Sequence, residues 1–201
     1  MYQGLIHWAG SIRFRLRRGW CAPMIGSWKT NMFLEASMLT PEAFKLVVES
    51  TPLVAIDFIV RAPDGKILLG KRNNRPAQGS WFAPGGRILK DESVKLSFLR
   101  LLDHELGLRP EDVEASSLGL YQHFYHDNFS LENFSTHYVV MAYEIQVQDK
   151  PCTLPDKQHS DYKWFEQDDL LVSREVHQYT KWYFMQNKQA DSALKQDLHA
   201  L

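Results

Sequence analysis

The chain has 201 residues and a mass of 23.4 kDa, which suits one ordinary domain with an appendage and excludes a multidomain machine. Hydrophobic residues make up 44% and charged residues 23% of the sequence, so the chain can bury a core and is not disordered as a whole. The net charge of −1 is unevenly divided, because residues 1–31 carry five basic side chains and no acid, which leaves the rest acidic. An acidic body lacks the basic stripe that phosphate backbones require, which excludes a nucleic-acid-binding protein.

The two cysteines, Cys21 and Cys152, provide neither a disulfide framework nor a metal-binding pair. Their use indicates a reducing compartment, so we expect a cytoplasmic protein. The sequence contains no run of about 18 apolar residues and therefore predicts no membrane span.

The first 31 residues are basic, rich in tryptophan and interrupted by glycine and proline, so they predict no regular element. Their arginines loosely resemble those of a targeting peptide or a membrane-surface strip. We favour a flexible, disordered tail or a translation start placed upstream of the true one, because no sustained apolar region accompanies the arginines. Met32 is the candidate true start.

The next residues predict a helix followed by a β-hairpin. Thr40 can cap a helix that begins at Pro41 and ends near Ser50. Alternating apolar stretches and turn residues then predict, in order, a strand at 53–60, a turn at 63–66, a strand at 67–69, a loop at 73–79, a short strand at 81–82 and a tight turn at 84–86.

The second half predicts one long helix, further strands and two C-terminal helices. The long helix runs from an N-cap at Asp91 to Leu106 and ends at Gly107. Its inner face is expected to hold Val94, Phe98, Leu101 and Leu102. The remaining elements are strands at 118–125, 137–147 and 162–165, loops at 127–133 and 150–161, a short helix capped by Asp168 and a helix over 173–189. This mixture predicts an α+β or α/β layered domain.

Residues 85–108 combine a glycine pair with charged and aliphatic residues at fixed offsets, and they resemble the Nudix box. That pattern is G-x5-E-x7-R-E-U-x-E-E-x-G-U, in which U is a bulky aliphatic residue. Seven of its nine defined positions match, namely Gly86, Glu92, Arg100, Leu102, Glu105, Gly107 and Leu108. Two positions depart from it, because Leu101 and His104 stand where the box has glutamates. The length of the pattern and its context of strand, loop and helix make it far more specific than a lone glycine motif.

The two departures change the chemistry that the box can support. Positions 101, 104 and 105 are neighbours on a helix, so a full box gathers three carboxylates that hold divalent cations against a pyrophosphate. This chain keeps only Glu105, since Leu101 cannot bind a hard cation and His104 is a poor ligand for Mg²⁺. We therefore expect a single metal ion and a catalytic base from outside the box. We interpret Glu92 and Arg100 as a scaffold pair.

Six stretches extend the resemblance to one atypical Nudix family, the GDP-mannose mannosyl hydrolases, whose own box lacks the same carboxylates. The resemblance covers residues 32 to 185, and the stretches that carry it are 53–58, 69–79, 81–87, 122–125, 136–140 and 154–159. It implies an α/β/α sandwich, a Nudix fold with a mixed β-sheet between helices, over residues 32–190, between a basic extension at 1–31 and a tail at 191–201. It also implies a homodimer.

The activity that the resemblance implies is hydrolysis of GDP-mannose, and of GDP-glucose, to GDP and free sugar. The family uses one Mg²⁺ or Mn²⁺ per active site, and its water attacks carbon C1 of the sugar with inversion. The implied metal ligands are the carbonyl of Gly85, the carboxylate of Glu105 and the amide oxygen of Gln158, all oxygen donors suited to a hard cation. His159 is the implied base, a task that histidine can perform near neutral pH.

The resemblance also implies roles for residues around the substrate. Arg72 and Arg87 grip the diphosphate, Tyr138 supports the leaving group, Asp57 and His123 lie near the sugar and the diphosphate, and Phe33, Leu34 and Phe44 contact the nucleotide. Simpler roles remain open for two of these residues. Asp57 could form a buried ion pair with an arginine, and Tyr138 could simply pack its ring.

Two other functions remain open. The first is a nucleoside-diphosphate-sugar pyrophosphatase, which cleaves a P–O bond. The second is a non-catalytic Nudix domain that binds a nucleotide sugar, and the presence of both Gln158 and His159 argues against it.

Overall fold

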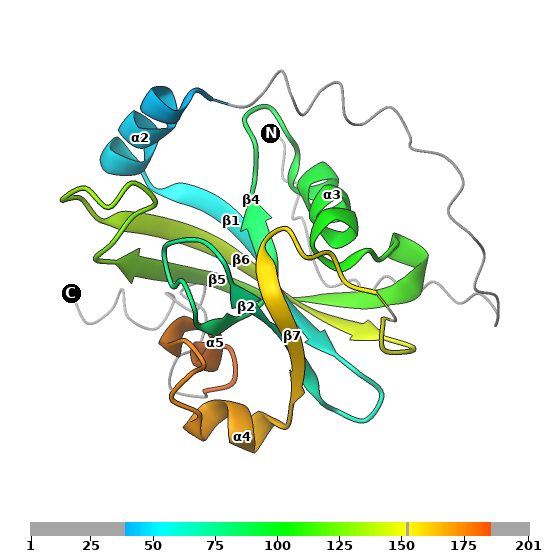
Figure 1. Cartoon of the computed structure of the whole chain (residues 1–201). Coiled ribbons are helices and arrows are strands. Elements are labelled where there is room, and N and C mark those ends of the chain that lie inside the picture. The colour runs from blue at the N-terminus through cyan, green and yellow to red at the C-terminus, as the bar shows by residue number, and fades with distance from the viewer. Residues whose placement is uncertain (1–38, 152, 186–201) are drawn as a thin grey trace, which may run out of the picture.

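The structure is a computed structural model, and it describes residues 39–151 and 153–185. Seven strands form one mixed β-sheet. Figure 1 shows this sheet between helices. Five strands follow the order β3-β2-β1-β6-β5, while β4 pairs with β1 and β7 pairs with β2. The sheet is mixed because β1 and β6 are parallel, whereas the other pairs are antiparallel. The predicted α+β class, with a mixed sheet between helices, is confirmed.

The elements have the following bounds. The strands are β1 (Leu53–Arg61), β2 (Ile67–Arg72), β3 (Trp81–Phe82), β4 (Gly85–Arg87), β5 (Val113–Tyr125), β6 (Thr136–Val147) and β7 (His159–Phe165). The helices are α2 (Pro41–Ser50), α3 (Val94–Leu106), the short 3-10 helix η1 (Pro110–Asp112), α4 (Gln167–Val172) and α5 (Gln178–Trp182).

The sheet buries a hydrophobic cluster on each face, and alternation along β1 assigns its residues to the two clusters. One cluster contains Ile56, Phe58 and Val60 together with Leu101, Leu102 and Leu106 of α3. The other contains Ala55 and Ile59 together with Leu170, Val176, Tyr179 and Tyr183 from the α4–α5 region. Each fully buried side chain of this kind contributes about 1.5–3 kcal/mol. The same alternation directs Asp57 to the face that the α4–α5 region covers.

The first helix and the hairpin form as predicted. The Thr40 hydroxyl accepts a hydrogen bond from the Ala43 N–H at 3.2 Å, and Pro41 is the first residue of α2. Strands β1 and β2 pair antiparallel around the predicted turn. Strand β5 begins at Val113 and so extends the predicted strand at its N-terminal end.

Helix α3 begins later than predicted. Its N-cap is Ser93, whose hydroxyl accepts a hydrogen bond from the Leu96 N–H, while Asp91 adopts a φ of 63° in the preceding loop. Aspartate tolerates this left-handed conformation better than most residues. Val94 is consequently the first helical residue and is 39% exposed, so its predicted place on the inner face is wrong. The predicted end is confirmed, because Gly107 has a φ of 62° and caps α3.

The predicted tight turn at residues 84–86 is a strand instead. Gly85 to Arg87 form β4, which pairs antiparallel with β1 and sets Gly85 opposite Asp57. The glycines serve close approach, because a Cβ atom at Gly85 would lie 2.2 Å from the Ile56 carbonyl oxygen. At Gly86, a Cβ atom would lie 2.6 Å from the Leu101 side chain. Glycine inside a strand commonly marks such an approach.

The C-terminal region also departs from the prediction. Glu166, rather than Asp168, precedes α4, and the predicted helix over 173–189 is a non-helical stretch at 173–177 followed by α5. The Trp81 N–H donates to the Glu175 carbonyl at 2.9 Å, and the His177 N–H donates to the Trp81 carbonyl at 3.0 Å. This pairing with β3 uses backbone groups that a continuous helix would have needed.

Some predictions fall outside the described residues. These are the basic extension at 1–31, the start at Met32, the end of the last helix and the tail at 191–201. Where the structure describes the chain, no helix has the length and apolar character needed to cross a membrane.

Candidate active site

A cleft with an inner and an outer part lies beside β1 and β4. The inner cavity has a volume of about 110 Å³ and is lined by Ala55, Asp57, Arg72, Pro76, Phe82, Gly85, Gly86, Arg87, His123, Tyr125, Tyr138, Val140 and Gln158. The outer cavity has a volume of about 600 Å³, and Arg72, Arg87, Tyr138 and Gln158 line both. The two cavities therefore form one continuous cleft.

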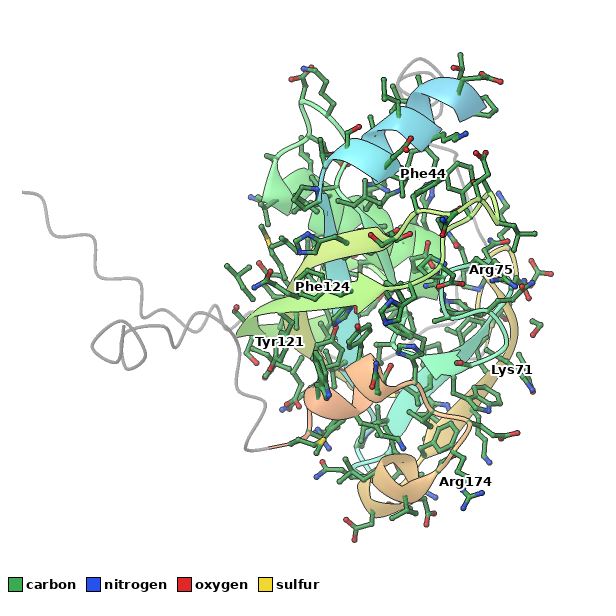
Figure 2. The ribbon with its side chains drawn as sticks, turned by 90° about the vertical axis from the view of Figure 1, so that its left-hand side faces the viewer. Phe44, Lys71, Arg75, Tyr121, Phe124 and Arg174 are labelled. Atoms are coloured by element: carbon green, nitrogen blue, oxygen red, sulfur yellow. The ribbon has the colours of Figure 1, made fainter. Side chains whose placement is uncertain are left out.

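Aromatic side chains and arginines form the wall of the outer cavity. The Phe44 and Phe129 ring centroids are 4.8 Å apart, and the Arg87 guanidinium carbon lies 4.0 Å from the Phe44 ring centroid. A salt bridge between Lys45 and Glu132 ties α2 to the loop that carries Phe129. Figure 2 shows Phe44 below α2 and Arg75, another residue of the outer wall, in the loop after β2.

Asp57 is the acidic residue of the inner cavity. The Tyr183 hydroxyl donates a hydrogen bond to its Oδ2 atom at 2.6 Å. Burial raises the pKa of the Asp57 carboxyl to about 6, although the hydrogen bond from Tyr183 and the charge of Arg72 act in the opposite direction. The direct partner of Asp57 is thus a tyrosine rather than the arginine of the ion-pair alternative.

Glu105 is a second buried acid, and it reaches the site from α3 on the other face of the sheet. Its side chain lies against β4, where a Cβ atom at Gly86 would be 3.9 Å from Oε1. The Oε2 atom is buried and has no hydrogen-bond partner among the described residues. Burial raises the pKa of Glu105 to about 7, while Arg72, Arg100 and the Gln158 side chain oppose the rise.

The three predicted metal ligands lie close together. Gly85 and Gln158 line the inner cavity, and the Gln158 side chain interacts with Glu105. The loop that carries Gln158 is held in place because the Asn73 N–H donates to the Gln158 backbone carbonyl at 3.0 Å. An unpaired buried carboxylate oxygen beside an amide and a backbone carbonyl is a donor set that fits a hard divalent cation. Over residues 39–151 and 153–185 there is no metal-type cluster of three or more His, Cys, Asp or Glu side chains.

His159, the predicted base, lies behind the cavity wall rather than in it. It is the first residue of β7 and is 2% exposed, and its Nε2 atom is 3.9 Å from Oε2 of Glu105. Burial and the charge of Arg72 lower the pKa of the imidazole to about 4, so the ring is neutral at pH 7. The pair is not an ion pair at that pH, because 3.9 Å exceeds a hydrogen bond and His159 carries no charge.

Gly70 makes room for the His159 ring. A Cβ atom at Gly70 would lie 2.4 Å from two atoms of that ring. Gly70 belongs to β2, and the register of the β2–β7 ladder shifts between Lys71 and Arg72 where Arg72 meets His159. Gly70 directly follows the predicted strand at 67–69 and lies inside the observed β2, so a glycine in a strand was the available sequence signal for this approach.

His123 lies in the floor of the inner cavity as a neutral group. Its ring stacks on Tyr179 with centroids 4.3 Å apart, and its Nε2 atom is 3.3 Å from the Tyr183 hydroxyl. Burial lowers the pKa of His123 to about 3. His123 can therefore exchange hydrogen bonds in the cavity without bringing a charge.

The remaining predicted residues divide between the cleft and its scaffold. Burial raises the pKa of the Tyr138 hydroxyl and lowers the pKa of the Arg87 guanidinium, which is partly desolvated. The Arg100 side chain bonds both carboxylate oxygens of Glu92, at 2.6 and 2.7 Å, and donates to the Arg87 carbonyl at 2.9 Å. The scaffold interpretation of Glu92 and Arg100 is confirmed, and the pair anchors the backbone that carries Arg87.

Two residues predicted to contact the nucleotide, Phe33 and Leu34, lie outside the described residues, so their role stays a prediction. Pro76, Phe82 and Tyr125 line the inner cavity although no sequence pattern assigned them a role. Tyr183 was also missed, because a tyrosine in a C-terminal segment looks like any core aromatic.

Known proteins resemble the chain over most of its length. Residues 51–187 match the NUDIX domain family. The Low-salt glycan biosynthesis protein Agl8 of Haloferax volcanii is 39% identical over 127 residues, which cover 62% of this chain and 78% of that protein. The ADP-ribose pyrophosphatase of Methanocaldococcus jannaschii is 41% identical over 70 residues, which cover 35% of this chain and 40% of that protein.

Solved structures agree with the fold. A MutT NUDIX hydrolase from Burkholderia pseudomallei is 25% identical, with a TM-score of 0.53 over 67% of this chain and 96% of that one. A MutT protein from Methanosarcina mazei Go1 is 21% identical, with a TM-score of 0.52 over 67% of this chain and 92% of that one.

The contact between Gly70 and His159 can be tested by stability. Gly70→Ala should lower the free energy of unfolding by about 2 kcal/mol, because the added methyl group overpacks the space that the imidazole fills. In a His159→Ala background the same substitution should cost much less, since the obstructing ring is gone. Urea unfolding of the four proteins measures both costs, and equal costs in the two backgrounds would contradict this placement of His159.

Proposed function

The chain belongs to the Nudix family of hydrolases, and we propose that it hydrolyses GDP-mannose, and GDP-glucose as well, to GDP and free sugar. The proposed reaction is attack of water on carbon C1 of the sugar with inversion, in a homodimeric enzyme. Its sequence basis is the set of stretches shared with the GDP-mannose mannosyl hydrolases. The name of the Haloferax volcanii relative, a glycan biosynthesis protein, suits an enzyme of activated sugars.

The observation that carries the proposal is the single carboxylate that α3 brings to the site. Glu105 lies against Gly86, whereas Leu101 is buried in the hydrophobic core and His104 is exposed. A box of three carboxylates could hold several cations and supply a base for attack on phosphorus. With Glu105 alone, the base must come from elsewhere, and His159 is its neighbour.

Gly85, Glu105 and Gln158 are the residues that would hold one Mg²⁺ or Mn²⁺. Such an ion supplies Lewis acidity, which stabilises the negative charge that develops on a leaving diphosphate. The acidic body of the protein provides no general positive field for that charge. The cation and a few individual side chains must therefore stabilise the negative charge of the diphosphate.

In the proposed enzyme Arg72 and Arg87 contact the diphosphate, and the observation that supports this role is that both line the inner and the outer cavity. A guanidinium can bind two phosphate oxygens with parallel hydrogen bonds. Arg87 rests on the Phe44 ring and is partly desolvated, so a bound phosphate gains from its charge without displacing much water. Tyr138 lies between the two cavities and can donate its hydroxyl to the leaving oxygen.

In the proposed reaction His159 takes the proton of the attacking water, which requires the wall between its buried ring and the inner cavity to open when metal and substrate bind. The water oxygen bonds to C1, the bond between C1 and the β-phosphate oxygen breaks, and GDP leaves with the electron pair. A neutral imidazole is the form that accepts a proton, and the His159 ring is neutral at pH 7 because its pKa is lowered to about 4. Negative charge from a bound diphosphate raises the pKa of a nearby histidine toward the range suited to a base.

The outer cavity can accept the nucleoside. Phe44 and Phe129 offer aromatic faces, and Asn73, Asn74 and Gln78 add amide groups around the same space. A flat base can stack on the rings while amides bond its edge. The sugar then occupies the inner cavity beside Asp57 and His123.

Cleavage of the P–O bond is the second candidate. The observation that favours it is the 41% identity over 70 residues with a protein named ADP-ribose pyrophosphatase. That reaction would release a nucleoside monophosphate and a sugar phosphate. The two reactions differ in the atom that water attacks, so isotope labelling separates them.

Hydrolysis of GDP-mannose in ¹⁸O-water with Mg²⁺ should place the label in mannose and leave GDP unlabelled. Mass spectrometry of the products identifies the bond that breaks, and proton NMR of the first-formed mannose anomer reports inversion. Label in GDP, or release of GMP with mannose 1-phosphate, would support phosphorus attack and refute the proposal. Metal-dependent binding without turnover would identify a binding domain.

Substitution of the proposed base provides a second test. His159→Gln should lower kcat by about 100-fold or more with little change in KM, because proton transfer in the transition state contributes factors of this size. Lys157→Gln, an exposed change two residues earlier in the loop before β7, is the matched control and should retain activity. Near-normal kcat in His159→Gln would rule out this base.

The proposed metal site can be tested without turnover. Mg²⁺ at about 100 times its Kd should stabilise the protein by about 2.7 kcal/mol, which thermal unfolding detects as a higher Tm. At one fixed Mg²⁺ concentration the Tm increase should be larger at pH 8 than at pH 6, because the raised pKa of Glu105, about 7, leaves the carboxyl protonated at the lower pH and the cation must displace that proton.

The metal test has two controls. One is the pH dependence of stability in the metal-free protein, and the other is a substitution on the same helix. A raised carboxyl pKa means that the stability contributed by Glu105 is present at low pH and is lost as pH rises from about 4.5 to about 7. Glu105→Gln should abolish both this loss and the Mg²⁺ effect, whereas Asp103→Asn, an exposed change beside it, should preserve both. An unchanged Mg²⁺ effect in Glu105→Gln would exclude Glu105 as a ligand.

A further inference from the structure

We infer that Tyr183 is a positioning residue, whose hydroxyl holds the carboxyl of Asp57 in the orientation that the substrate cavity requires. This inference rests on the proposed function, in which Asp57 contacts the sugar. Tyr183 does not line the inner cavity, so it acts through Asp57.

The two oxygens of Asp57 have different surroundings. The Tyr183 hydroxyl binds Oδ2 at 2.6 Å, whereas Oδ1 faces β4, where a Cβ atom at Gly85 would be only 2.7 Å away. The Oδ2 atom is therefore held by a hydrogen bond from the α5 side, whereas the Oδ1 atom faces Gly85 at the edge of the cavity. A carboxyl that could rotate would not present the same oxygen to a ligand each time.

The hydroxyl of Tyr183 joins two cavity groups at once. Its distance to Nε2 of His123 is 3.3 Å, and the ring of His123 stacks on Tyr179. A phenol oxygen can donate one hydrogen bond and accept another. Donation to Asp57 and acceptance from His123 would lock both side chains of the cavity floor in one arrangement.

The segment that carries Tyr183 is itself firmly anchored. The Thr180 hydroxyl accepts a hydrogen bond from the Ala83 N–H at 3.2 Å, and a parallel bridge joins Val176 to Trp81. The Tyr179 hydroxyl bonds the backbone of Phe124 at the end of β5. Strands β3 and β5, together with the residue that follows β3, therefore fix the position from which Tyr183 reaches Asp57, which makes the hydroxyl a rigid support.

Tyr183→Phe removes the hydroxyl and keeps the ring in the core. We expect kcat for GDP-mannose to fall by about 10-fold, since loss of a hydrogen bond to a carboxylate at a preorganised site weakens transition-state stabilisation by this order. KM should change by less than about 2-fold, because the diphosphate and nucleoside contacts remain. Steady-state kinetics on the full chain measures both constants.

The control is Tyr143→Phe, which removes a hydroxyl from a tyrosine that packs on Phe98 in the other hydrophobic cluster. Tm values show whether both variants fold equally well. A kcat loss of the same size in Tyr143→Phe would reduce the effect of Tyr183 to general destabilisation and overturn the inference. Normal kcat in Tyr183→Phe would overturn it as well.

A double-mutant cycle with Asp57→Asn tests the path of the effect. If Tyr183 acts through Asp57, its removal in the Asp57→Asn background should cause little further loss of kcat. Additive losses in an active enzyme would overturn the positioning role and leave the proposed function intact. An inactive wild type would overturn the proposed function, and the same cycle in urea unfolding would then decide whether the two side chains are coupled.

Discussion

At Gly85 and Gly86 the sheet has no room for side chains, and most of the site follows from that constraint. The first glycine lies opposite Asp57 and close to its carboxyl, and the second lies against Leu101 and Glu105. Asp57 belongs to the face covered by the α4–α5 region, whereas Glu105 arrives with α3 on the other face. Because nothing projects from β4 at these two positions, acids from opposite faces approach the same short strand.

This arrangement buries ionisable groups, and burial of their charged forms costs free energy. Burial favours the neutral forms, so the pKa values of Asp57 and Glu105 rise to about 6 and about 7, while that of His159 falls to about 4. Such groups tend to cluster where a protein performs chemistry rather than where it gains stability. In the proposed enzyme, a bound cation supplies the positive charge that the carboxylates lack in the protein alone. A bound diphosphate supplies the negative charge that favours a protonated imidazole.

Much of the fold followed from local patterns, because caps, turns and alternation are local properties. Thr40, the turn at 63–66 and Gly107 acted as expected. The misassigned glycine pair and the interrupted C-terminal helix depend on long-range contacts, with β1 in one case and with Trp81 in the other. The residues that the Nudix box and its neighbouring motifs predicted as metal ligands lie close together in the structure. No sequence pattern could indicate that His159 lies behind the wall of the inner cavity or that Tyr183 supports Asp57.

The anchoring of Tyr183 has a consequence for the order in which the site is completed. A chain is synthesised from its N-terminus, and every residue that lines the inner cavity, up to Gln158, precedes Tyr183. Those residues do not form the cavity by themselves, because its face of the sheet also needs Val176, Tyr179 and Tyr183 for the hydrophobic cluster. The cleft and the support of Asp57 are therefore completed together, when the segment after α4 packs on β3 and β5, and a protease that removed this segment would abolish both.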